Sequence, residues 1–306
     1  MSQETIVITE EKVHPDAVAL LKDYRLCYTG ARFTQEDLTA LVKREQPVGI
    51  LFRYGRITEQ VLLASQKLRA IGRHGVGMDA IDREAAKRLG IEAIAAVGSN
   101  SQAVAELALG LILACARHIS WLDRRMHEGH WDKQSYQGFE LSGAMLGLVG
   151  CGSIGARVMR FAQAIGMRVM VCDPYLQVHQ LPRGVDKVEL EELLTSSDVV
   201  SLHCPLDECT RNMLDARRLD LLRKGAIVVN TARAGILDEV AMRKKLHADE
   251  LYLGLDCFVE EPINMESPWT GTPNAILTPH IGGTTNGGLR GMAVGAARSI
   301  LSVLER

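Results

Sequence analysis

The chain has 306 residues, the length of about two ordinary domains. Apolar residues make up 47% and charged residues 24%, a balance typical of folded globular proteins and unlike that of disordered or collagen-like chains. The 35 basic and 37 acidic side chains leave a net charge of −2, so no basic excess points to nucleic acid or to an anionic membrane.

Targeting and redox features favour a cytoplasmic protein. The longest apolar run, 107–116, is shorter than the roughly 20 residues of a transmembrane helix. The N-terminus passes directly into the apolar run 5–9 without a charged segment, so we expect no secretory signal. The seven cysteines are scattered and form no C-x-x-C pair, which is typical of reduced thiols.

The first hundred residues alternate between strand and helix patterns. Strands are expected at Thr5–Thr9, Leu26–Thr29, Val48–Phe52, Leu68–Gly72 and Ile91–Val97. Helices are expected at Pro15–Tyr24, Gln35–Glu45, Glu59–Ser65 and Arg83–Leu89. Thr34 precedes Asp37 by the spacing of a capping box, which marks the start of the second helix. This alternation predicts an α/β fold with a mostly parallel sheet covered on both faces.

A long apolar helix is expected at Ser101–Ile119, followed by an exposed polar and aromatic segment at Trp121–Gln137. A second α/β series begins at Ala144. Its strands are expected at Met145–Val149, Arg168–Cys172, Val199–His203, Ala226–Asn230, Leu251–Asp256 and Ala275–Thr278. Residues 284–306 form a final helix of small and apolar residues.

A glycine-rich segment, Gly150-Cys151-Gly152-Ser153-Ile154-Gly155, follows the strand Met145–Val149 and opens a helix. That setting is the one in which the G-x-G-x-x-G spacing binds a dinucleotide. Gly150 permits the tight turn, Gly152 lets the backbone approach a pyrophosphate, and Gly155 lets helix and strand pack closely. The free N–H groups at the helix start would bind the phosphates.

Asp173 follows the next strand, 18 residues past Gly155. A carboxylate at this place accepts hydrogen bonds from the adenosine ribose and repels a 2′-phosphate. We therefore predict NAD, not NADP, as the cofactor.

Four ordered segments carry further signal: 202–206 (LHCPL), 230–235 (NTARAG), 254–262 (GLDCFVEEP) and 278–283 (TPHIGG). In the first half, 51–53 (LFR) and 75–79 (GVGMD) add to them. Together they resemble the D-isomer-specific 2-hydroxyacid dehydrogenases, with the phosphoglycerate dehydrogenases as the nearest variety. The resemblance extends over nearly the whole chain.

The resemblance implies a two-domain fold that a linear reading does not give. A Rossmann-type NAD-binding domain, 101–283, would be inserted into a flavodoxin-like substrate-binding domain of residues 1–100 and 284–306. The crossings near Gly98–Ser101 and Thr284 would act as hinges, with the active site in the cleft between domains.

Hydride transfer to a 2-oxo acid needs a proton for the carbonyl oxygen and a cation for the carboxylate. Arg233 suits the second task, because its planar fork can hold two oxygens. The resemblance makes His280 the general acid in reduction and the base in oxidation. Glu261, rather than the adjacent Glu260, matches the family's Glu-Pro motif and would orient the imidazole and favour its charged form.

Further contacts follow from the resemblance alone. Those to the cofactor are Ser153, Ile154, Cys204, Pro205, Thr231, Ala232, Asp256 and Gly283. Those to the substrate are Arg53, Val76 and Gly77. Two positions depart from the phosphoglycerate dehydrogenase pattern: bulky Tyr54 replaces a small polar residue, and Ala80 stands where Asn is common. The chain also ends soon after its last helix, so we expect no C-terminal regulatory domain.

Three alternatives stay open. Within the enzyme class, the protein could reduce hydroxypyruvate, glyoxylate or another 2-oxo acid. A non-catalytic NAD-binding regulator is disfavoured because Arg233, Glu261 and His280 are all present. A zinc site at 127–130 (HEGH) is disfavoured because its histidines are three residues apart rather than four, so we predict no metal.

The segment 121–136 mixes aromatic and charged residues, a composition enriched at interfaces. In the family this region packs against a second subunit. We therefore predict a homodimer, or a tetramer of two dimers, acting on a small 2-hydroxy or 2-oxo acid.

Overall fold

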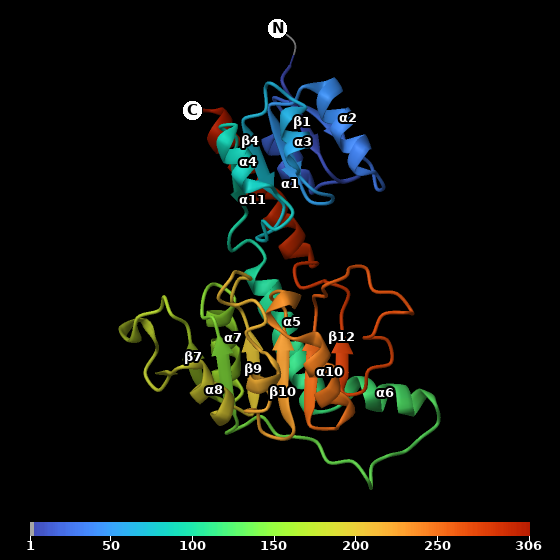
Figure 1. Cartoon of the computed structure of the whole chain (residues 1–306), viewed down its shortest axis with the longest axis vertical. Coiled ribbons are helices and arrows are strands. Elements are labelled where there is room, and N and C mark those ends of the chain that lie inside the picture. Colours follow the sequence, from blue (N-terminus) through green and yellow to red (C-terminus); the bar gives the residue numbers. More distant parts are fainter. Residues whose placement is uncertain (1–2) are drawn as a thin grey trace. The chain divides into compact units, whose positions relative to one another are not determined.

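The computed structural model describes residues 3–306. The chain divides into two compact units, shown in Figure 1. The first runs up to Asn100 and includes Gly283–Arg306, and the second is Ser101–Gly282. Gly283, which we expected at the end of the NAD-binding domain, groups with the first unit.

The first unit is a five-stranded parallel sheet with the order β2-β1-β3-β4-β5. The strands are β1 (Thr5–Ile8), β2 (Arg25–Tyr28), β3 (Gly49–Phe52), β4 (Ala70–Arg73) and β5 (Glu92–Ala95). The helices are α1 (Pro15–Leu20), α2 (Gln35–Glu45), α3 (Glu59–Leu63), α4 (Arg83–Arg88) and α11 (Asn286–Leu304). This is the flavodoxin-like strand order. The capping box is present, because Thr34 and Asp37 exchange backbone-to-side-chain hydrogen bonds at the start of α2.

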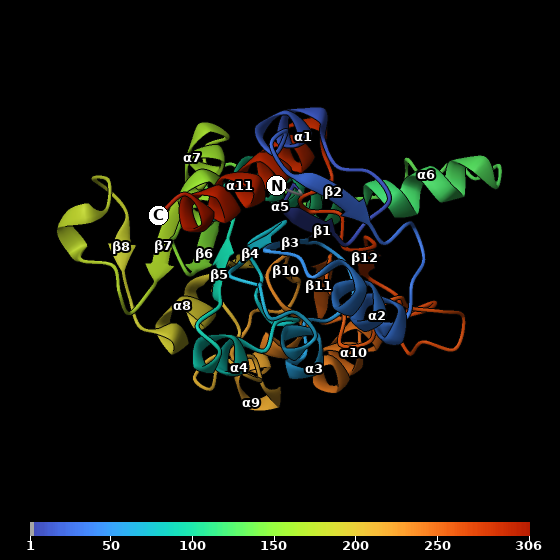
Figure 2. The ribbon, with the colours of Figure 1, turned by 90° about the horizontal axis from the view of Figure 1, so that it is seen from above.

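The C-terminal helix α11 packs on β3, β4 and β5 and runs beside α1, as Figure 2 shows. Its small residues allow a close approach to the sheet. A Cβ at Gly72 would lie 2.2 Å from the Ala296 carbonyl oxygen, and one at Gly49 would lie 2.9 Å from the Ile300 side chain. The glycines in the strands and the small residues of α11 therefore explain how the last segment of the chain completes the first unit.

The second unit is a seven-stranded parallel sheet with the order β12-β11-β10-β9-β6-β7-β8. The strands are β6 (Met145–Val149), β7 (Arg168–Cys172), β8 (Asp186–Lys187), β9 (Val199–Leu202), β10 (Ala226–Asn230), β11 (Leu251–Leu255) and β12 (Ala275–Leu277). The helices are α5 (Ser101–Ala116), α6 (Ile119–His127), α7 (Gly155–Ala164), α8 (Leu190–Ser196), α9 (Ala216–Leu219) and α10 (Glu239–His247).

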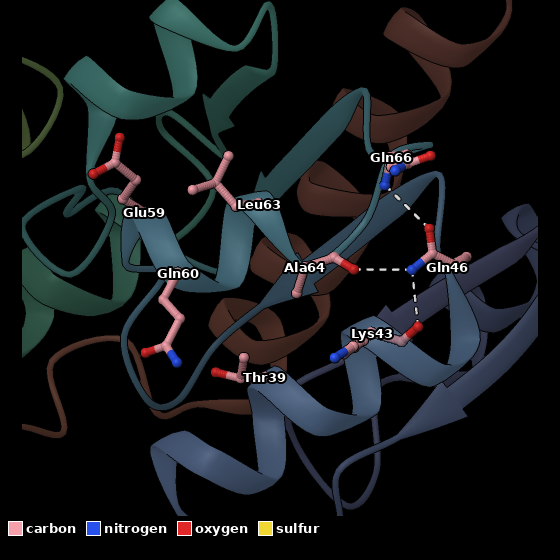
Figure 3. Close-up of a pocket in the computed structure, with 8 residues that line it drawn as sticks. All are labelled: Thr39, Lys43, Gln46, Glu59, Gln60, Leu63, Ala64 and Gln66. Carbon is pink, nitrogen blue, oxygen red and sulfur yellow. Dashed lines mark hydrogen bonds between the residues drawn. The ribbon is translucent and has the colours of Figure 1, made fainter.

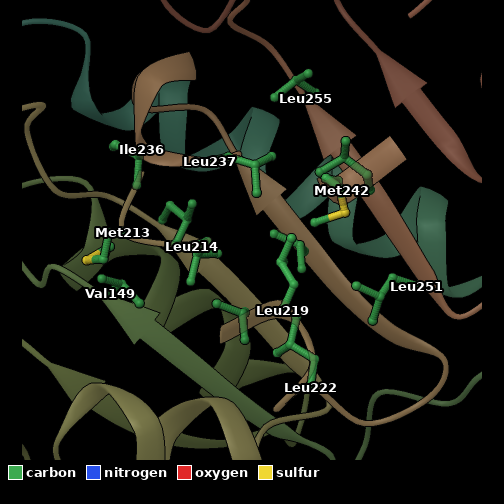
Figure 4. Close-up of a cluster of buried hydrophobic side chains, with 14 of the residues drawn as sticks. Val149, Met213, Leu214, Leu219, Leu222, Ile236, Leu237, Met242, Leu251 and Leu255 are labelled. Carbon is green, nitrogen blue, oxygen red and sulfur yellow. The ribbon is translucent and has the colours of Figure 1, made fainter. Parts of the chain in front are cut away.

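A cluster of buried aliphatic side chains fills one face of this sheet (Figure 4). Leu214, Leu219 and Ile236 are fully or almost fully buried between the strands and the segments that follow them. Helix α5 is buried on the opposite side with Leu146, Leu148 and Val158. The apolar strands therefore form a rigid support for the loops at their carboxyl ends.

The segment after α5 differs from our expectation. The helix ends at Ala116, and His118 adopts a left-handed conformation with φ 48°. A separate helix, α6, then covers Ile119–His127 and extends away from the sheet of its own unit (Figures 1 and 2). We expected an exposed polar and aromatic segment at Trp121–Gln137 and predicted no helix within it. The exposure is observed, since α6 has no buried residue, but most of the segment's first half is helical.

Within residues 3–306, no single helix is long and apolar enough to span a membrane. Helices α5 and α6 pass that test only when taken together, as a pair bent by 62°.

Candidate active site

The predicted site residues of the second unit all follow the carboxyl ends of its parallel strands. The glycine-rich turn follows β6, Asp173 follows β7, Arg233 follows β10, Glu261 follows β11 and His280 follows β12. In open α/β sheets this is the edge at which ligands bind.

The three glycines of the turn have three different surroundings. A Cβ at Gly150, whose φ is 87°, would lie 2.8 Å from the backbone of His203, and one at Gly155 would lie 2.3 Å from the Gly150 carbonyl oxygen. A Cβ at Gly152 would meet nothing within 4 Å. The first and third glycines are thus required for close packing, and the second leaves open space beside the backbone, as a pyrophosphate requires.

The carboxylate of Asp173 is held in place by the turn. It accepts a hydrogen bond from the Cys151 N–H at 2.8 Å and one from the Tyr175 N–H at 2.9 Å. Each carboxylate oxygen can accept more than one hydrogen bond, so these contacts orient the group without excluding a ribose. Ser153, in the same turn, is joined to Ser101 by a hydroxyl contact of 2.9 Å.

Two residues beside the turn carry groups that stay uncharged. Burial lowers the pKa of His203 to about 4, so its imidazole is neutral near pH 7, and its Nε2 lies 2.8 Å from the Ser201 hydroxyl. Burial raises the pKa of the Cys204 thiol to about 12, so that thiol stays protonated. Pro205 follows it in an exposed loop.

The loop after β10 is shaped by Asn230, a fully buried side chain. Its amide donates to the Arg233 carbonyl at 2.9 Å, and its oxygen accepts from the Ala232 N–H at 3.0 Å. Arg233 itself donates to the Ala232 carbonyl at 2.6 Å. Thr231 has a buried hydroxyl oxygen with no hydrogen-bond partner among residues 3–306. Such a group fits a position that a ligand completes.

His280 and Glu261 are in direct contact. The His280 Nδ1 lies 2.8 Å from Oε2 and 3.0 Å from Oε1 of Glu261. Glu261 is in turn held by the Phe258 N–H, which donates to Oε1 at 2.9 Å. His280 has a left-handed backbone with φ 53°, an uncommon conformation for a residue other than glycine and one that recurs at functional sites.

Asp256 supports the His280 loop. Its buried carboxylate accepts hydrogen bonds from the Thr278 hydroxyl at 2.6 Å, the Ile281 N–H at 2.9 Å and the Gly282 N–H at 2.8 Å. The donors flank His280 on both sides. The resemblance implies a place for Asp256 beside the nicotinamide, and its observed contacts give it the further role of fixing the loop that carries the His280 imidazole. Reasoning from the sequence missed this role, and also that of Asn230.

The remaining predicted residues lie in the first unit. Arg53 follows β3 and pairs with Glu10, Val76 is exposed, and the Gly77 carbonyl accepts a hydrogen bond from Arg73. A Cβ at Gly283 would lie 3.0 Å from the amide nitrogen of Asn100.

A surface pocket of the first unit lies between α2 and α3 (Figure 3). It is lined mostly by polar side chains such as Thr39, Lys43 and Gln60. The Gln46 amide donates to the carbonyls of Lys43 and Ala64, so it serves to join the two helices. None of the predicted site residues belongs to the lining.

Among residues 3–306, no three His, Cys, Asp or Glu side chains gather in a group that could hold a metal ion. The exposed side chains of His127 and His130 lie near carboxylates 3.7 and 4.0 Å away, which is a solvated surface pattern.

Comparison with known proteins identifies the family. A model of the D-isomer specific 2-hydroxyacid dehydrogenase NAD-binding domain matches residues 109–282. A hydroxypyruvate reductase of Thermotoga maritima is 37% identical over 269 residues, 87% of each chain. The chain belongs to the D-isomer-specific 2-hydroxyacid dehydrogenases.

Two further comparisons, one with a sequence and one with a solved structure, show how far the likeness extends. A D-3-phosphoglycerate dehydrogenase of Methanocaldococcus jannaschii is 35% identical over 98% of this chain, and this chain spans 57% of that protein. The crystal structure of the TT0316 protein from Thermus thermophilus has a TM-score of 0.89, with 33% identity over 98% of this chain and 97% of that one.

Membership of the D-isomer-specific 2-hydroxyacid dehydrogenases confirms the predicted fold class and cofactor. The protein is an NAD-dependent oxidoreductase of the 2-hydroxyacid class, with a Rossmann-type NAD-binding domain. The open backbone at Gly152 and the unpartnered Thr231 hydroxyl fit that cofactor.

Proposed function

We propose that this protein interconverts a D-2-hydroxy acid and its 2-oxo acid, with His280 as the acid–base residue. The contact of 2.8 Å between His280 and Glu261 carries this proposal. Because Nδ1 faces the carboxylate, Nε2 is the ring nitrogen that gives a proton to the carbonyl oxygen in reduction and takes one back in oxidation. Glu261 stabilises the positive charge that the ring carries before it gives up its proton.

Arg233 is proposed to bind and orient the substrate carboxylate through its guanidinium fork. Gly150, Gly152, Ser153, Ile154 and Gly155 would hold the cofactor pyrophosphate, and Asp173 the adenosine ribose. Cys204 and Pro205 would flank the adenine, and Thr231, Ala232, Asp256 and Gly283 would lie near the nicotinamide end. When the cofactor is bound, its reduced form NADH supplies the hydride for reduction and its oxidised form NAD⁺ accepts it in oxidation.

We propose the 3-phosphoglycerate and 3-phosphohydroxypyruvate pair as the first substrate candidate. Support comes from Arg53, a cation at the carboxyl edge of the first unit, and from a relative named D-3-phosphoglycerate dehydrogenase that matches 98% of this chain. Hydroxypyruvate and glyoxylate are the second candidate, because the hydroxypyruvate reductase of Thermotoga maritima matches 87% of both chains.

The test is turnover of the purified protein with NADH and a panel of 3-phosphohydroxypyruvate, hydroxypyruvate, glyoxylate and pyruvate. The proposal expects oxidation of NADH with at least one member, and the largest kcat/KM identifies the substrate. A protein that binds NADH but turns over none of the 2-oxo acids would instead support the non-catalytic regulator.

We propose that α6 and the following segment form the interface of a homodimer, two of which can assemble into a tetramer. Ile119, Trp121, Met126 and Trp131 are exposed by 42–74% of their surface. Arg125 stacks on Trp121 and forms two hydrogen bonds with Asp132, which fixes the aromatic face in one orientation. Light scattering should show a dimer or tetramer, and Met126→Glu should give monomers while Val178→Glu, at another exposed site, should not.

We also propose a reducing, cytoplasmic location. All seven cysteines are free thiols in the structure. Cell fractionation tests this proposal, and recovery of the protein with disulfide bonds from an oxidising compartment would contradict it.

A further inference from the structure

Three neighbouring strands of the first unit end in a buried polar cluster. Glu10 follows β1, Arg53 follows β3 and His74 follows β4, and these strands are adjacent in the sheet. Hydrogen bonds from backbone N–H groups join the three segments. The His74 N–H donates to the Phe52 carbonyl at 2.8 Å, and the Arg53 N–H donates to the Thr9 side-chain hydroxyl at 2.8 Å.

The centre of the cluster is an ion pair. Arg53 Nη1 donates to Glu10 Oε2 at 2.7 Å, with the Glu10 side chain 4% exposed and that of Arg53 23% exposed. Burial raises the pKa of Glu10, and the Arg53 guanidinium opposes that rise. A buried carboxylate is costly unless it is paired with a cation in good geometry. The Glu10 carboxylate, which is almost inaccessible to water, therefore holds the Arg53 guanidinium in one position.

The two other nearby side chains, His74 and Arg73, do not hold the Arg53 guanidinium in place. Burial, together with the charges of Arg53 and Arg73, lowers the pKa of His74 to about 4, so its ring is neutral near pH 7. Its Nε2 lies 4.0 Å from Glu10 Oε1, beyond hydrogen-bond distance. Arg73 donates to the carbonyls of Gly77 and Arg53 at 2.8 and 2.5 Å, so it braces the backbone around the cluster.

The Arg53 guanidinium is restrained on two sides. One of its N–H groups is bonded to Glu10, and its flat face lies 4.8 Å from the centre of the Tyr54 ring. A guanidinium has five N–H donors in a fixed fork. Within residues 3–306, Glu10 is the one side chain that hydrogen-bonds to this guanidinium, so the fork retains donors for an anion.

We infer that Glu10 is a positioning residue, which holds the Arg53 guanidinium in the orientation that binds the anionic end of the substrate. This inference rests on the proposed substrate contact of Arg53. The anion is a carboxylate or a phosphate, since both match the fork. Glu10 touches neither substrate nor cofactor in this account and acts through Arg53.

The test is a double-mutant cycle between Glu10→Ala and Arg53→Ala, with Glu11→Ala as an exposed control next in the chain. Each single variant of the pair should raise KM at least tenfold for the best substrate of the panel, with kcat within about twofold of wild type. The double variant should be no worse than Arg53→Ala alone, because a residue that acts only through Arg53 adds nothing after its removal. Glu10→Gln, which keeps an acceptor for Arg53, should recover part of the loss.

Titration calorimetry with oxalate and with inorganic phosphate gives a readout that needs no turnover. The ligand whose binding Arg53→Ala weakens identifies carboxylate or phosphate as the anion, and Glu10→Ala should weaken the same ligand about tenfold. The NADH dissociation constant and the Tm of Glu10→Gln should stay near those of wild type.

The inference is overturned if Glu10→Ala and Glu10→Gln leave KM and anion binding unchanged, if the two penalties simply add, or if Arg53→Ala weakens neither anion. If instead the wild-type protein binds an anion in a manner that depends on Glu10 but reduces no 2-oxo acid, the proposed function fails and the positioning role of Glu10 stands.

Discussion

The Nδ1 atom of His280 faces both oxygens of Glu261, at 2.8 and 3.0 Å. The two residues follow the neighbouring strands β11 and β12, and they lie 19 positions apart in the sequence. Glu261 also accepts a hydrogen bond from the Phe258 N–H, so its carboxylate has a fixed position from which it orients the imidazole. The pair is therefore preorganised by the chain itself.

The variant Glu261→Gln removes the negative charge of the side chain and keeps its shape. The amide fills the same space but no longer stabilises an imidazolium, so kcat for 2-oxo acid reduction should fall at least tenfold. Steady-state rates with saturating substrate measure this effect, and the NADH dissociation constant should change less than threefold. An unchanged kcat would contradict the role of Glu261. Glu260→Gln is the matched control at the adjacent position.

Asp256→Ala should damage catalysis through the His280 loop. The variant leaves the buried Gly282 N–H and the partly buried Ile281 N–H without their acceptor, and a buried group left unsatisfied costs about 1–3 kcal/mol. We expect a lower Tm and a kcat reduced at least tenfold. Asp256→Asn, which keeps one acceptor oxygen, should lose less on both measures. Equal loss in the two variants would show that the negative charge, rather than the loop geometry, is what matters.

Asp173→Asn should weaken the preference for NAD. The amide oxygen can still accept one of the N–H groups of Cys151 and Tyr175, so the turn should keep its shape. Loss of the negative charge removes the repulsion of a 2′-phosphate. The ratio of kcat/KM for NADH to that for NADPH should fall about tenfold or more. If this ratio is near one in the wild-type protein, Asp173 does not select NAD over NADP.

His74 should make the protein sensitive to acid. Its pKa is about 4 in the folded state against an ordinary value of 6.5, so the unfolded chain binds more protons between these values. The contribution of neutral His74 to the free energy of unfolding is present above pH 6.5 and is lost as the pH falls towards 4. Between pH 7 and pH 5 this loss amounts to about 2 kcal/mol. Glu10, whose pKa is raised, acts in the opposite direction.

Urea unfolding of wild type and His74→Asn at pH 7 and pH 5 measures this contribution. The variant should lose less stability than wild type over that interval, because asparagine does not titrate. Other buried groups such as His203 titrate alike in both proteins and cancel in the comparison. An equal loss would show that His74 becomes protonated without cost.

Most of the fold could be predicted from the sequence because its strands are short apolar runs between helices with clear start signals. Helix Gln35–Glu45 was predicted to its last residue, since the capping box of Thr34 and Asp37 marks its beginning. Helix α6 was not predicted, although its apolar residues Ile119, Leu122 and Met126 recur at helical spacing. The helix buries no residue, and the charged run 123–125 between these positions favoured an exposed segment. The two-residue strand β8 carries too little pattern to be recognised.

The sequence identified the candidate catalytic residues, but it did not identify the residues that hold them in position. Motifs place Arg233, Glu261 and His280 at strand ends, and the structure adds the contact between the last two. The roles of Asp256 and Asn230 depend on how loops return to a strand, and Asp256 accepts from residues 22 to 26 positions away. The Glu10–Arg53 pair joins residues 43 positions apart, which a single sequence does not reveal.

The most direct test of the account is the turnover of His280→Asn with saturating 2-oxo acid, using NADH and its 4-deuterated form to establish that hydride transfer limits the rate. Asparagine keeps a polar side chain but cannot carry the proton, and positioned acid–base catalysis contributes roughly 10²–10⁴-fold. We predict that kcat falls at least 100-fold while the NADH dissociation constant stays within threefold of wild type. A variant that kept near-full kcat with hydride transfer rate-limiting would contradict the account, because the proton would then come from another group.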